Sequence, residues 1–284
     1  LVAYYPFDNN FNDNSGNGYN LSSFGSPTAT FDKNLNDLSA YEFDNTGDYA
    51  TQSNVAFQLT EYTIPAWFSI LSSGIKQSII AKGPTDNSNP LNYHIWIGAD
   101  NKLYAGYEYS DFTLVTVSSV QTIQTGKWYH VGMVADPANG ELKLYINGSP
   151  VATSTVASPP GTSTDPLIIG LNDDGTSLTN QFVGVLDEFR IFNRVLSADE
   201  ISAAYFENLE KKSGNYTIGT VDPVNIGDYP TFNDAVNDLA DRGIDGDVVF
   251  KVENGTYNEQ VSIPFISGTD QGYAITFESE SLDN

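Results

Sequence analysis

The chain has 284 residues with 12 Lys or Arg against 36 Asp or Glu, so its formal net charge is −24. This charge repels phosphates and anionic membranes, which argues against nucleic acid as a partner. The chain has no cysteine, which excludes disulfides, thiol catalysis and thiolate zinc sites. Hydrophobic residues make up 40% of it, enough for a sizeable core, but no run of about 18 apolar residues predicts membrane insertion.

Residues 1 to about 195 are rich in Val, Ile, Tyr, Phe and Thr, which favour β-strands. Short Asn, Gly and Pro clusters separate the segments and are typical of turns. Many strands with regular turns predict an all-β antiparallel sandwich or barrel. The predicted strands cover residues 1–7, 62–70, 78–81, 93–97, 102–107, 128–135, 142–146, 167–169 and 184–192.

Alternation along residues 141–147 supports this prediction. Leu142, Leu144 and Ile146 share one face of an extended segment, and Lys143 and Tyr145 share the other. A short helix is then predicted over residues 197–205, with Ser197 as N-cap and a Glu three residues later. The polar stretch 210–214 follows, so the first domain is predicted to span residues 1–210.

Residues 211–284 have a different pattern. Thr231 is a good N-cap for an amphipathic helix with Ala235, Val236 and Leu239 on one stripe, and Gly243 ends it. Short strands are predicted over residues 247–252, 260–263 and 274–278. About 70 residues with so few elements bury little by themselves, so this small α+β segment is predicted to open a longer domain.

A series of short motifs follows in order along the first domain. They cover residues 1–8, 12–18, 41–44, 48–49, 63–67, 79–83, 126–131 (Gly-Lys-Trp-Tyr-His-Val), 142–148, 184–191 (Gly-Val-Leu-Asp-Glu-Phe-Arg-Ile) and 196–201. In this order they resemble the laminin-G-like family of the concanavalin-type fold. The resemblance implies a jelly-roll β-sandwich whose two chain ends lie close together.

Three motifs of the second segment carry another resemblance. Residues 228–236 (Asp-Tyr-Pro-Thr-Phe-Asn-Asp-Ala-Val), 248–252 and 255–263 are similar to the start of right-handed parallel β-helices of the pectin-lyase type. The resemblance implies an N-terminal cap helix followed by the first coils of a solenoid, truncated at residue 284. In enzymes with that fold, the catalytic residues lie in later coils.

The loop after the first predicted strand is dense in oxygen donors and glycine. It contains Asp8, Asn12, Asn14 and Gly18. Calcium takes six to eight oxygens from carboxylates, amides and backbone carbonyls, so the loop predicts a structural calcium ion. The laminin-G-like resemblance implies that the first and last strands run side by side, which lets Asp187 complete the site. The alternative is a turn rich in Asn and Asp that binds no metal.

Two further acidic loops are competing cation sites, at residues 44–48 and 172–175. Each also suits an ordinary strand-ending turn.

Three tyrosines lie close together at Tyr104, Tyr107 and Tyr109. A tyrosine has a flat apolar face and a polar tip, so these side chains are candidates for stacking on a sugar ring. The alternative is that they line the outer face of a sheet without a ligand. Trp67 and Trp128 are predicted to be core residues, and Trp96 suits the core as well.

Catalytic patterns are absent from the sequence. His94 and His130 are the only histidines, and neither has a nucleophile in a recognisable setting. Laminarinase-type glycosidases, which share the sandwich fold, carry a Glu-x-Asp-x-x-Glu strand that places acids on one face. This sequence has no such run, and adjacent Asp187 and Glu188 are expected to point to opposite faces of a strand.

These observations predict a non-catalytic, calcium-stabilised binding or adhesion module. Its expected ligand is a glycan or a surface protein, and other domains of the same polypeptide are further partners. The chain begins with Leu1 rather than Met, so we expect a trimmed piece of a larger secreted or cell-surface protein. The alternative is an accessory carbohydrate-binding domain of a polysaccharide-degrading enzyme whose catalytic β-helix lies beyond residue 284.

Overall fold

The computed structural model describes residues 1–44, 46–84, 88–173, 178–219 and 229–280. The chain divides into two compact units, Leu1–Tyr205 and Phe206–Asn284. We call them unit 1 and unit 2 and describe each by itself. Among the described residues, no helix is both long and apolar enough to cross a membrane.

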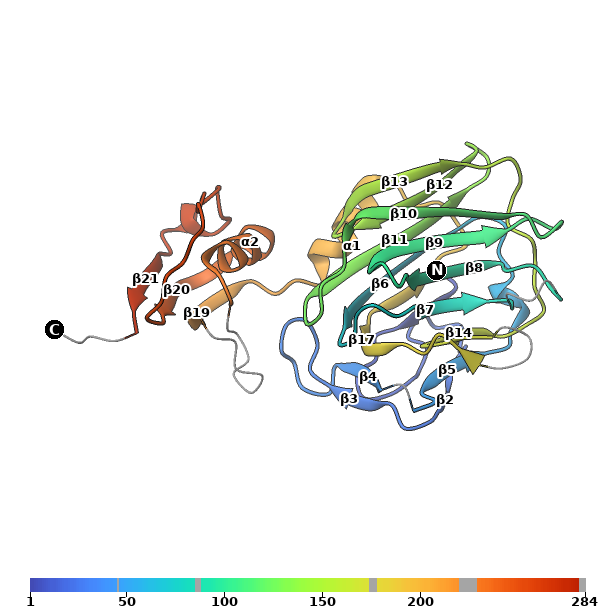
Figure 1. Ribbon diagram of the computed structural model, residues 1–284, viewed down its shortest axis with the longest axis horizontal. Helices are drawn as coiled ribbons and strands as arrows, with labels where there is room; N and C mark the ends of the chain where they lie inside the picture. The colour runs from blue at the N-terminus through green and yellow to red at the C-terminus, as the bar shows by residue number, and fades with distance from the viewer. Residues whose placement is uncertain (45, 85–87, 174–177, 220–228, 281–284) are drawn as a thin grey trace. The chain divides into compact units, whose positions relative to one another are not determined.

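Unit 1 is a sandwich of two seven-stranded antiparallel sheets (Figure 1). The front sheet of Figure 1 consists, in order, of β10 (Leu114–Thr122), β9 (Lys102–Glu108), β8 (Tyr93–Ile97), β7 (Gln77–Lys82), β14 (Leu167–Ile169), β5 (Tyr49–Gln52) and β2 (Ser22–Phe24). The back sheet consists of β13 (Ser149–Thr155), β12 (Glu141–Ile146), β11 (Trp128–Asp136), β6 (Tyr62–Ile70), β17 (Val183–Asp187), β4 (Ala40–Asp44) and β3 (Thr28–Thr30). The predicted all-β sandwich is confirmed.

Small elements complete unit 1. β1 (Ala3–Tyr5) pairs with β18 (Phe189–Ile191), so the first and last strands run side by side, as the family resemblance implies. β15 (Asn172–Asp173) pairs with β16 (Leu178–Thr179), and the turn η1 covers Val55–Phe57. Helix α1 (Ala198–Glu207) follows the last strand. It has the expected capping box, because the Glu200 N–H donates to Ser197 Oγ at 3.2 Å and Glu200 Oε2 accepts the Ser197 N–H at 2.9 Å.

The main core lies between the two sheets. Leu142, Leu144 and Ile146 of β12 all face it, which confirms the predicted alternation. Tyr145 points the other way and packs in a second cluster with Leu196 and with Ile201 of α1, so the helix covers the outer face of the back sheet. Close approach of the helix depends on Gly148, since a Cβ there would lie 3.1 Å from the Cα of Ser202.

The predicted strand over residues 184–192 is wrong in one respect. Glu188 has a φ of +55°, which interrupts the strand between β17 and β18. Before the break, β17 pairs with β4 and β6 in the back sheet; after it, β18 pairs with β1. Alternation is therefore lost at Glu188, and the argument that Asp187 and Glu188 point to opposite faces of one strand does not hold.

Unit 2 contains β19 (Lys212–Ile218), α2 (Phe232–Arg242), β20 (Ile244–Val252), the turn η2 (Thr269–Gln271) and β21 (Ile275–Ser279). The three strands pair in parallel. The helix is confirmed: Thr231 Oγ1 accepts the N–H of Asp234 at 3.1 Å, and Gly243 ends the helix with a φ of +72°. The apolar stripe of the helix is buried in the core of unit 2.

Two expectations for unit 2 were inaccurate. β19 was not predicted, and residues 260–263, predicted as a strand, have no regular structure. Val261 and Ile263 remain 37% and 57% exposed. No neighbouring strand pairs with this segment among the described residues of unit 2, and an extended segment without a partner forms no β-ladder.

Candidate functional site

The N-terminal loop is organised by Asp13, a residue that sequence reasoning did not single out. Its Oδ1 accepts the backbone N–H groups of Tyr4 at 3.0 Å and Ser15 at 2.9 Å. Its Oδ2 accepts the Ser15 hydroxyl and the N–H of Tyr19, both at 2.9 Å. Desolvation by itself raises the pKa of Asp13, but these hydrogen bonds outweigh it and lower the pKa below its ordinary value. The loop is therefore held by hydrogen bonds to one carboxylate.

The predicted calcium ligands within the loop lie around this centre. Asp8, Asn12, Asn14 and Gly18 are all exposed. Burial of its carboxylate and the charge of Asp32 raise the pKa of Asp8. The loop thus leaves several oxygens accessible to solvent.

The fifth predicted ligand, Asp187, already holds a cation supplied by the chain. Its Oδ2 lies 2.9 Å from the ammonium of Lys33, and both side chains are buried. The charge of Lys33 also acts on Asp8, so the structure brings Asp8 and Asp187 to the same lysine. The lysine ammonium therefore takes the place of a metal ion on the Oδ2 side of the carboxylate, while Asp187 Oδ1 is buried and has no hydrogen-bond partner among the described residues. Among the described residues, no group of three or more His, Cys, Asp or Glu side chains is arranged to hold a metal.

Asp187 belongs to a buried row across three neighbouring strands. His130 of β11 is paired with Trp67 of β6, and Trp67 is paired with Asp187 of β17. Tyr205 of α1 stacks on Trp67 with ring centroids 5.3 Å apart, and the ammonium of Lys33 lies 5.2 Å from the Trp67 ring centroid. His130 is buried, and its ring centroid lies 5.4 Å from that of Trp67 and 5.9 Å from that of Tyr205, so it is a core residue.

Glu188 is also fully engaged. Both of its carboxylate oxygens accept the hydroxyl of Tyr4, at 2.9 and 3.1 Å, and Oε2 accepts a guanidinium N–H of Arg190 at 3.1 Å. The neighbouring carboxylates Asp187 and Glu188 are therefore bound by different partners within the protein.

The two other acidic loops, at residues 44–48 and 172–175, are each described only in part, because residues 45, 174 and 175 lie outside the described residues. In the loop at residues 44–48, Asp48 accepts the N–H groups of Ser26 at 2.6 Å and Asp44 at 3.2 Å, while Asp44 accepts the hydroxyl of Thr46 at 2.6 Å. These bonds are typical of a strand-ending turn. Part of the loop at residues 172–175 lies outside the described residues.

The three predicted sugar-stacking tyrosines have different environments. Tyr107 is fully buried, and its hydroxyl donates to the carbonyl of Ser158 at 3.0 Å. It shares a side of β9 with Leu103 and Ala105, which face the core, so Tyr107 cannot stack on a ligand. Tyr109 is half-buried against the core, and its hydroxyl accepts the N–H of Ala157 at 2.7 Å. The prediction that Tyr107 stacks on a sugar is wrong, because strand alternation turns its side chain into the core.

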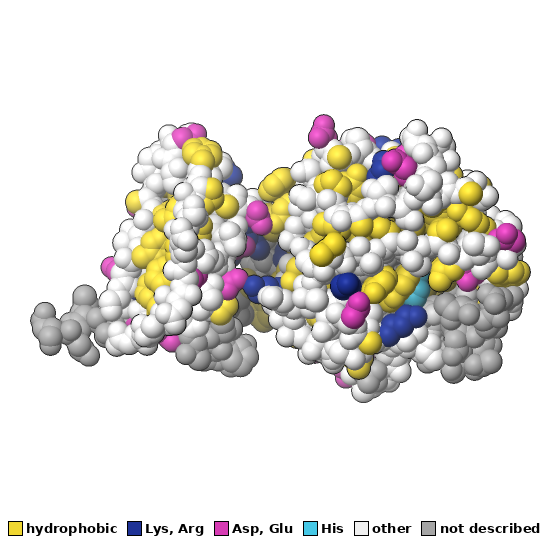
Figure 2. Space-filling view, turned by 45° about the horizontal axis from the view of Figure 1, so that its top comes forward, with side chains coloured by type: hydrophobic (Ala, Val, Ile, Leu, Met, Phe, Trp, Pro, Cys, Tyr) yellow, Lys and Arg dark blue, Asp and Glu magenta, His cyan; other side chains and the backbone are white. Residues whose placement is uncertain are grey.

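Tyr104 points to the opposite side of β9, onto the outer face of the front sheet. It is paired across strands with Trp96, and the two rings stack 5.2 Å apart at an interplanar angle of 11°. Trp96 stacks in turn on His94 with centroids 4.5 Å apart. Trp96 and Tyr104 are partly exposed. Figure 2 shows the visible edge of a histidine side chain on unit 1, with hydrophobic side chains and a lysine or arginine nearby.

His94 anchors this stack from below. It is buried, and its Nε2 lies 3.0 Å from the hydroxyl of Ser78. Burial, and secondly the positive charge of Lys76, lower the pKa of His94 to about 3. His94 is therefore neutral at physiological pH and acts as a fixed support for Trp96.

Polar side chains border the stack. The ammonium of Lys76 lies 5.6 Å from the centroid of the Trp96 ring. The hydroxyl of Tyr104 donates to Asp100 Oδ2 at 2.9 Å. Gly98 leaves room for the Tyr104 ring, since a Cβ there would lie 2.7 Å from Tyr104 Cε2. We call His94, Trp96, Tyr104, Lys76 and Asp100 the aromatic platform.

Sequence reasoning found only Tyr104 of this group. A signal for Trp96 was present, because Trp96 and Tyr104 each lie four residues from Asp100 in the turn between them. In a hairpin with Ile97 opposite Leu103, they must be cross-strand neighbours. Lys76 comes from the connection between β6 and β7, and no sequence pattern links it to Trp96.

A family model matches residues 44–202, more than half of the chain, and its description is the concanavalin A-like lectin/glucanases superfamily. The chain belongs to this superfamily. No curated protein matches the chain. The superfamily's name covers binding proteins and enzymes, so membership alone does not decide between the two activities.

Solved structures share the fold of this superfamily member at low sequence identity. Domain 4 of AbnA, a GH43 extracellular arabinanase from Geobacillus stearothermophilus in complex with arabinotriose, is 20% identical with a TM-score of 0.60; the match covers 72% of this chain and 98% of that one. The binding domain of Paraclostridial Mosquitocidal Protein 1 is 18% identical with a TM-score of 0.59, covering 74% and 53%.

The binding domain of botulinum neurotoxin serotype G is 15% identical with a TM-score of 0.57, covering 74% of this chain and 52% of that one. This chain therefore spans about half the length of the toxin binding domains and nearly all of the arabinanase domain. These likenesses concern the fold.

Proposed function

We propose that unit 1 is a non-catalytic carbohydrate-binding module and that the aromatic platform is its binding surface. The observation that carries this proposal is the stack of Trp96 on Tyr104, partly exposed on the outer face of the front sheet. Flat aromatic faces suit the C–H-rich faces of sugar rings, and the bordering polar groups suit sugar hydroxyls. The ligand is a glycan of a cell surface or of an extracellular polysaccharide.

The named neighbours support a binding role. One is a domain of an arabinanase in complex with arabinotriose, and others are binding domains of toxins. The arabinanase is described as extracellular, which supports an extracellular or cell-surface location for this protein as well. A glycan carried by a surface protein is included among the proposed partners.

The engagement of the adjacent carboxylates Asp187 and Glu188 also favours binding over hydrolysis. A glycosidase needs two carboxyl groups free to act on the scissile bond. Asp187 is bound by Lys33, and Glu188 is bound by Tyr4 and Arg190. Neither is free for acid–base work at a sugar.

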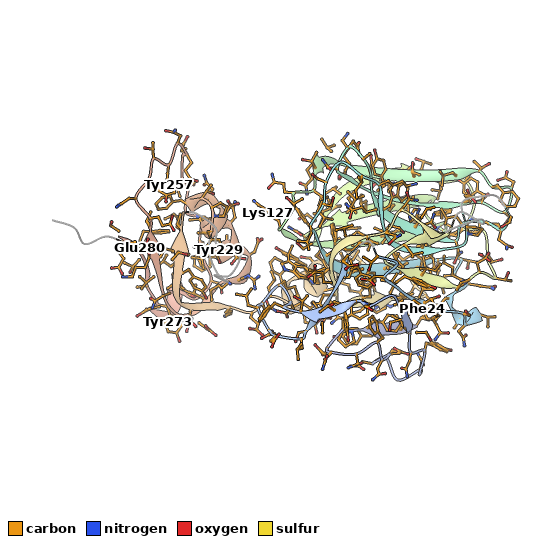
Figure 3. The ribbon with its side chains drawn as sticks, turned by 60° about the horizontal axis from the view of Figure 1, so that its bottom comes forward. Phe24, Lys127, Tyr229, Tyr257, Tyr273 and Glu280 are labelled. Atoms are coloured by element: carbon orange, nitrogen blue, oxygen red, sulfur yellow. The ribbon has the colours of Figure 1, made fainter. Side chains whose placement is uncertain are left out.

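Binding of the 284-residue chain to a glycan array, followed by calorimetry of the best ligand, tests the proposal. Trp96→Ala and Tyr104→Ala are each expected to lower affinity at least about tenfold, since one aromatic stacking contact contributes about 1–3 kcal/mol in comparable base-stacking sites. Phe24→Ala is the matched control. Phe24 is 46% exposed, stacks on Tyr49 at 4.7 Å and lies at the β2 edge of the same sheet (Figure 3). Undiminished binding by both platform variants contradicts the proposal.

A second proposal concerns the wider protein: unit 1 is an accessory domain, and unit 2 begins a parallel β-helix. The parallel pairing of β19, β20 and β21 supports this, as does the exposed alternation of Val261, Ile263 and Phe265, which a further coil would cover. Sequencing the coding region past residue 284 is the test. We expect repeated strands of similar length with acidic residues on one face. A different downstream pattern contradicts the parallel β-helix.

We also propose that a calcium ion stabilises the N-terminal loop through Asp8, Asn12, Asn14 and Gly18, without Asp187. The dense oxygen donors of the loop support this. Calcium at a hundredfold excess over Kd is expected to raise the unfolding free energy by about 2.7 kcal/mol. Asp8→Ala is expected to abolish that increase, whereas Asp13→Ala destabilises the loop with or without calcium. An identical Tm in calcium and in EDTA contradicts the metal.

A further inference from the structure

Positive charge is scarce in this chain, and most of it is neutralised at short range. At least eight of the twelve Lys and Arg side chains lie within 4.0 Å of a carboxylate: Lys33, Lys102, Lys143, Arg190, Arg194, Lys212, Arg242 and Lys251. Lys76 is not among them. Among the residues that the structure describes, no carboxylate lies within ion-pair distance of its ammonium. In a chain of net charge −24, the ammonium of Lys76 therefore lies at the aromatic platform without a carboxylate partner among the described residues.

Lys76 is exposed, and its side chain extends over the Trp96 ring. Its ammonium lies 5.6 Å from the Trp96 ring centroid, within the range of a cation–π contact. Desolvation lowers the pKa of Lys76, and its charge contributes to the low pKa of His94. The ammonium therefore acts directly on the platform, next to the ring on which a sugar would stack.

We infer that the platform selects glycans containing a carboxylate-bearing sugar, with one sugar ring stacked on Trp96 and Tyr104 and the carboxylate paired with Lys76. This inference rests on the proposed carbohydrate-binding function. A charge-assisted hydrogen bond from an ammonium to a carboxylate is roughly twice as strong as a neutral one.

The platform is also asymmetric. Asp100 accepts the hydroxyl of Tyr104 at the other end of the stack, so a ligand carboxylate is repelled there. The carboxylate is therefore expected at the Trp96 end and a neutral sugar at the Tyr104 end. The net charge of −24 opposes dense polyanions, but beyond about 8 Å it is largely screened at physiological salt. A single carboxylate in contact with Lys76 escapes most of that repulsion.

Matched probes that differ in charge test the inference. We would titrate the 284-residue chain with three pairs: 3′-sialyllactose and lactose, trigalacturonic acid and its methyl ester, and a glucuronic-acid-substituted xylotriose and xylotriose. In at least one pair the acidic member is expected to bind about tenfold more tightly, which is about 1.4 kcal/mol. The preference should fall as sodium chloride is raised.

Variants separate this inference from the proposed function. Lys76→Gln should remove the difference in affinity between the acidic and the neutral member of a pair, and Lys76→Arg should keep that difference. Lys102→Gln is the control, because Lys102 already lies 4.0 Å from Asp100 Oδ2. Equal binding of acidic and neutral members, or a preference that survives Lys76→Gln, overturns the inference alone. Absence of binding to every probe overturns the inference, and undiminished glycan binding by both Trp96→Ala and Tyr104→Ala overturns the proposed function with it.

Discussion

The ammonium of Lys33 lies 2.9 Å from Oδ2 of Asp187, although 154 residues separate the two along the chain. The lysine and aspartate side chains are only 3% and 2% exposed. This ion pair ties the segment before β4 to the end of β17, directly above Trp67. A predicted metal ligand is thus part of an internal salt bridge, and the pair has consequences that can be measured.

Removing either partner of the Lys33–Asp187 ion pair should destabilise the folded protein. Lys33→Met leaves the buried carboxylate of Asp187 without its cation, so the free energy of unfolding is expected to fall by about 3–5 kcal/mol. The double variant Lys33→Met/Asp187→Leu should recover most of that loss, because no buried charge remains. Urea unfolding measures both. Lys143→Met is the control: its partner Glu141 is 37% exposed, and such a pair contributes at most about 1 kcal/mol. Equal losses in the two single variants would falsify the buried pair.

Asp187 should also make stability depend on pH. Burial raises its pKa from 3.8 to about 7, against the opposing charge of Lys33. The folded protein then holds the proton more tightly than the unfolded chain, so this contribution to stability is complete below pH 3.8 and is lost as the pH rises to about 7. The stability of the native protein relative to Asp187→Asn should therefore decline over this window and become constant above it. A difference that is independent of pH contradicts the assignment.

His94 should have the opposite effect. Burial lowers its pKa from 6.5 to about 3, so the unfolded chain binds the proton first as the pH falls. Its contribution is present above pH 6.5 and is lost between pH 6.5 and 3. His94→Gln, which can still bond Ser78, should unfold with less acid sensitivity than the native protein. Denaturant titrations at several pH values between 7 and 4 provide the comparison, and parallel curves for the two proteins contradict the prediction.

Gly98 offers a test of the platform geometry that leaves every contacting side chain in place. A Cβ at this position would lie 2.6 Å from Asp100 Oδ1 and 2.7 Å from Tyr104 Cε2, so Gly98→Ala must displace the Tyr104 ring. Glycan affinity is expected to fall about tenfold, in proportion to one lost stacking contact of about 1–3 kcal/mol. Gly255→Ala, in unit 2, is the control with an ordinary 3.4 Å nearest contact. Unchanged affinity in Gly98→Ala shows that Tyr104 takes no part in binding.

Much of the fold could be predicted from local pattern. Strands β6, β8 and β14 have the predicted bounds, and α2 has the predicted caps, because alternation and capping depend on residues close together in the chain. Strands β4, β5 and β10 were not among the segments named as strands, and β2, β3 and β13 were missed as well. The residues of β2, β3 and β13 are largely exposed, so they carry little hydrophobic signal. The segment 260–263 has that signal but no partner strand, and therefore forms no sheet.

The sequence by itself determined the class of this protein: an all-β, acidic, cysteine-free sandwich of the concanavalin type, with a tyrosine-rich stretch at residues 104–109. Only the tertiary structure decided which tyrosine faces outward, since a one-residue difference in strand phase reverses a side chain's direction. It also decided that Asp187 meets Lys33 and that Lys76 lies over Trp96. Such contacts join residues from separate strands and loops, and their distances depend on how the two sheets pack rather than on any spacing along the chain.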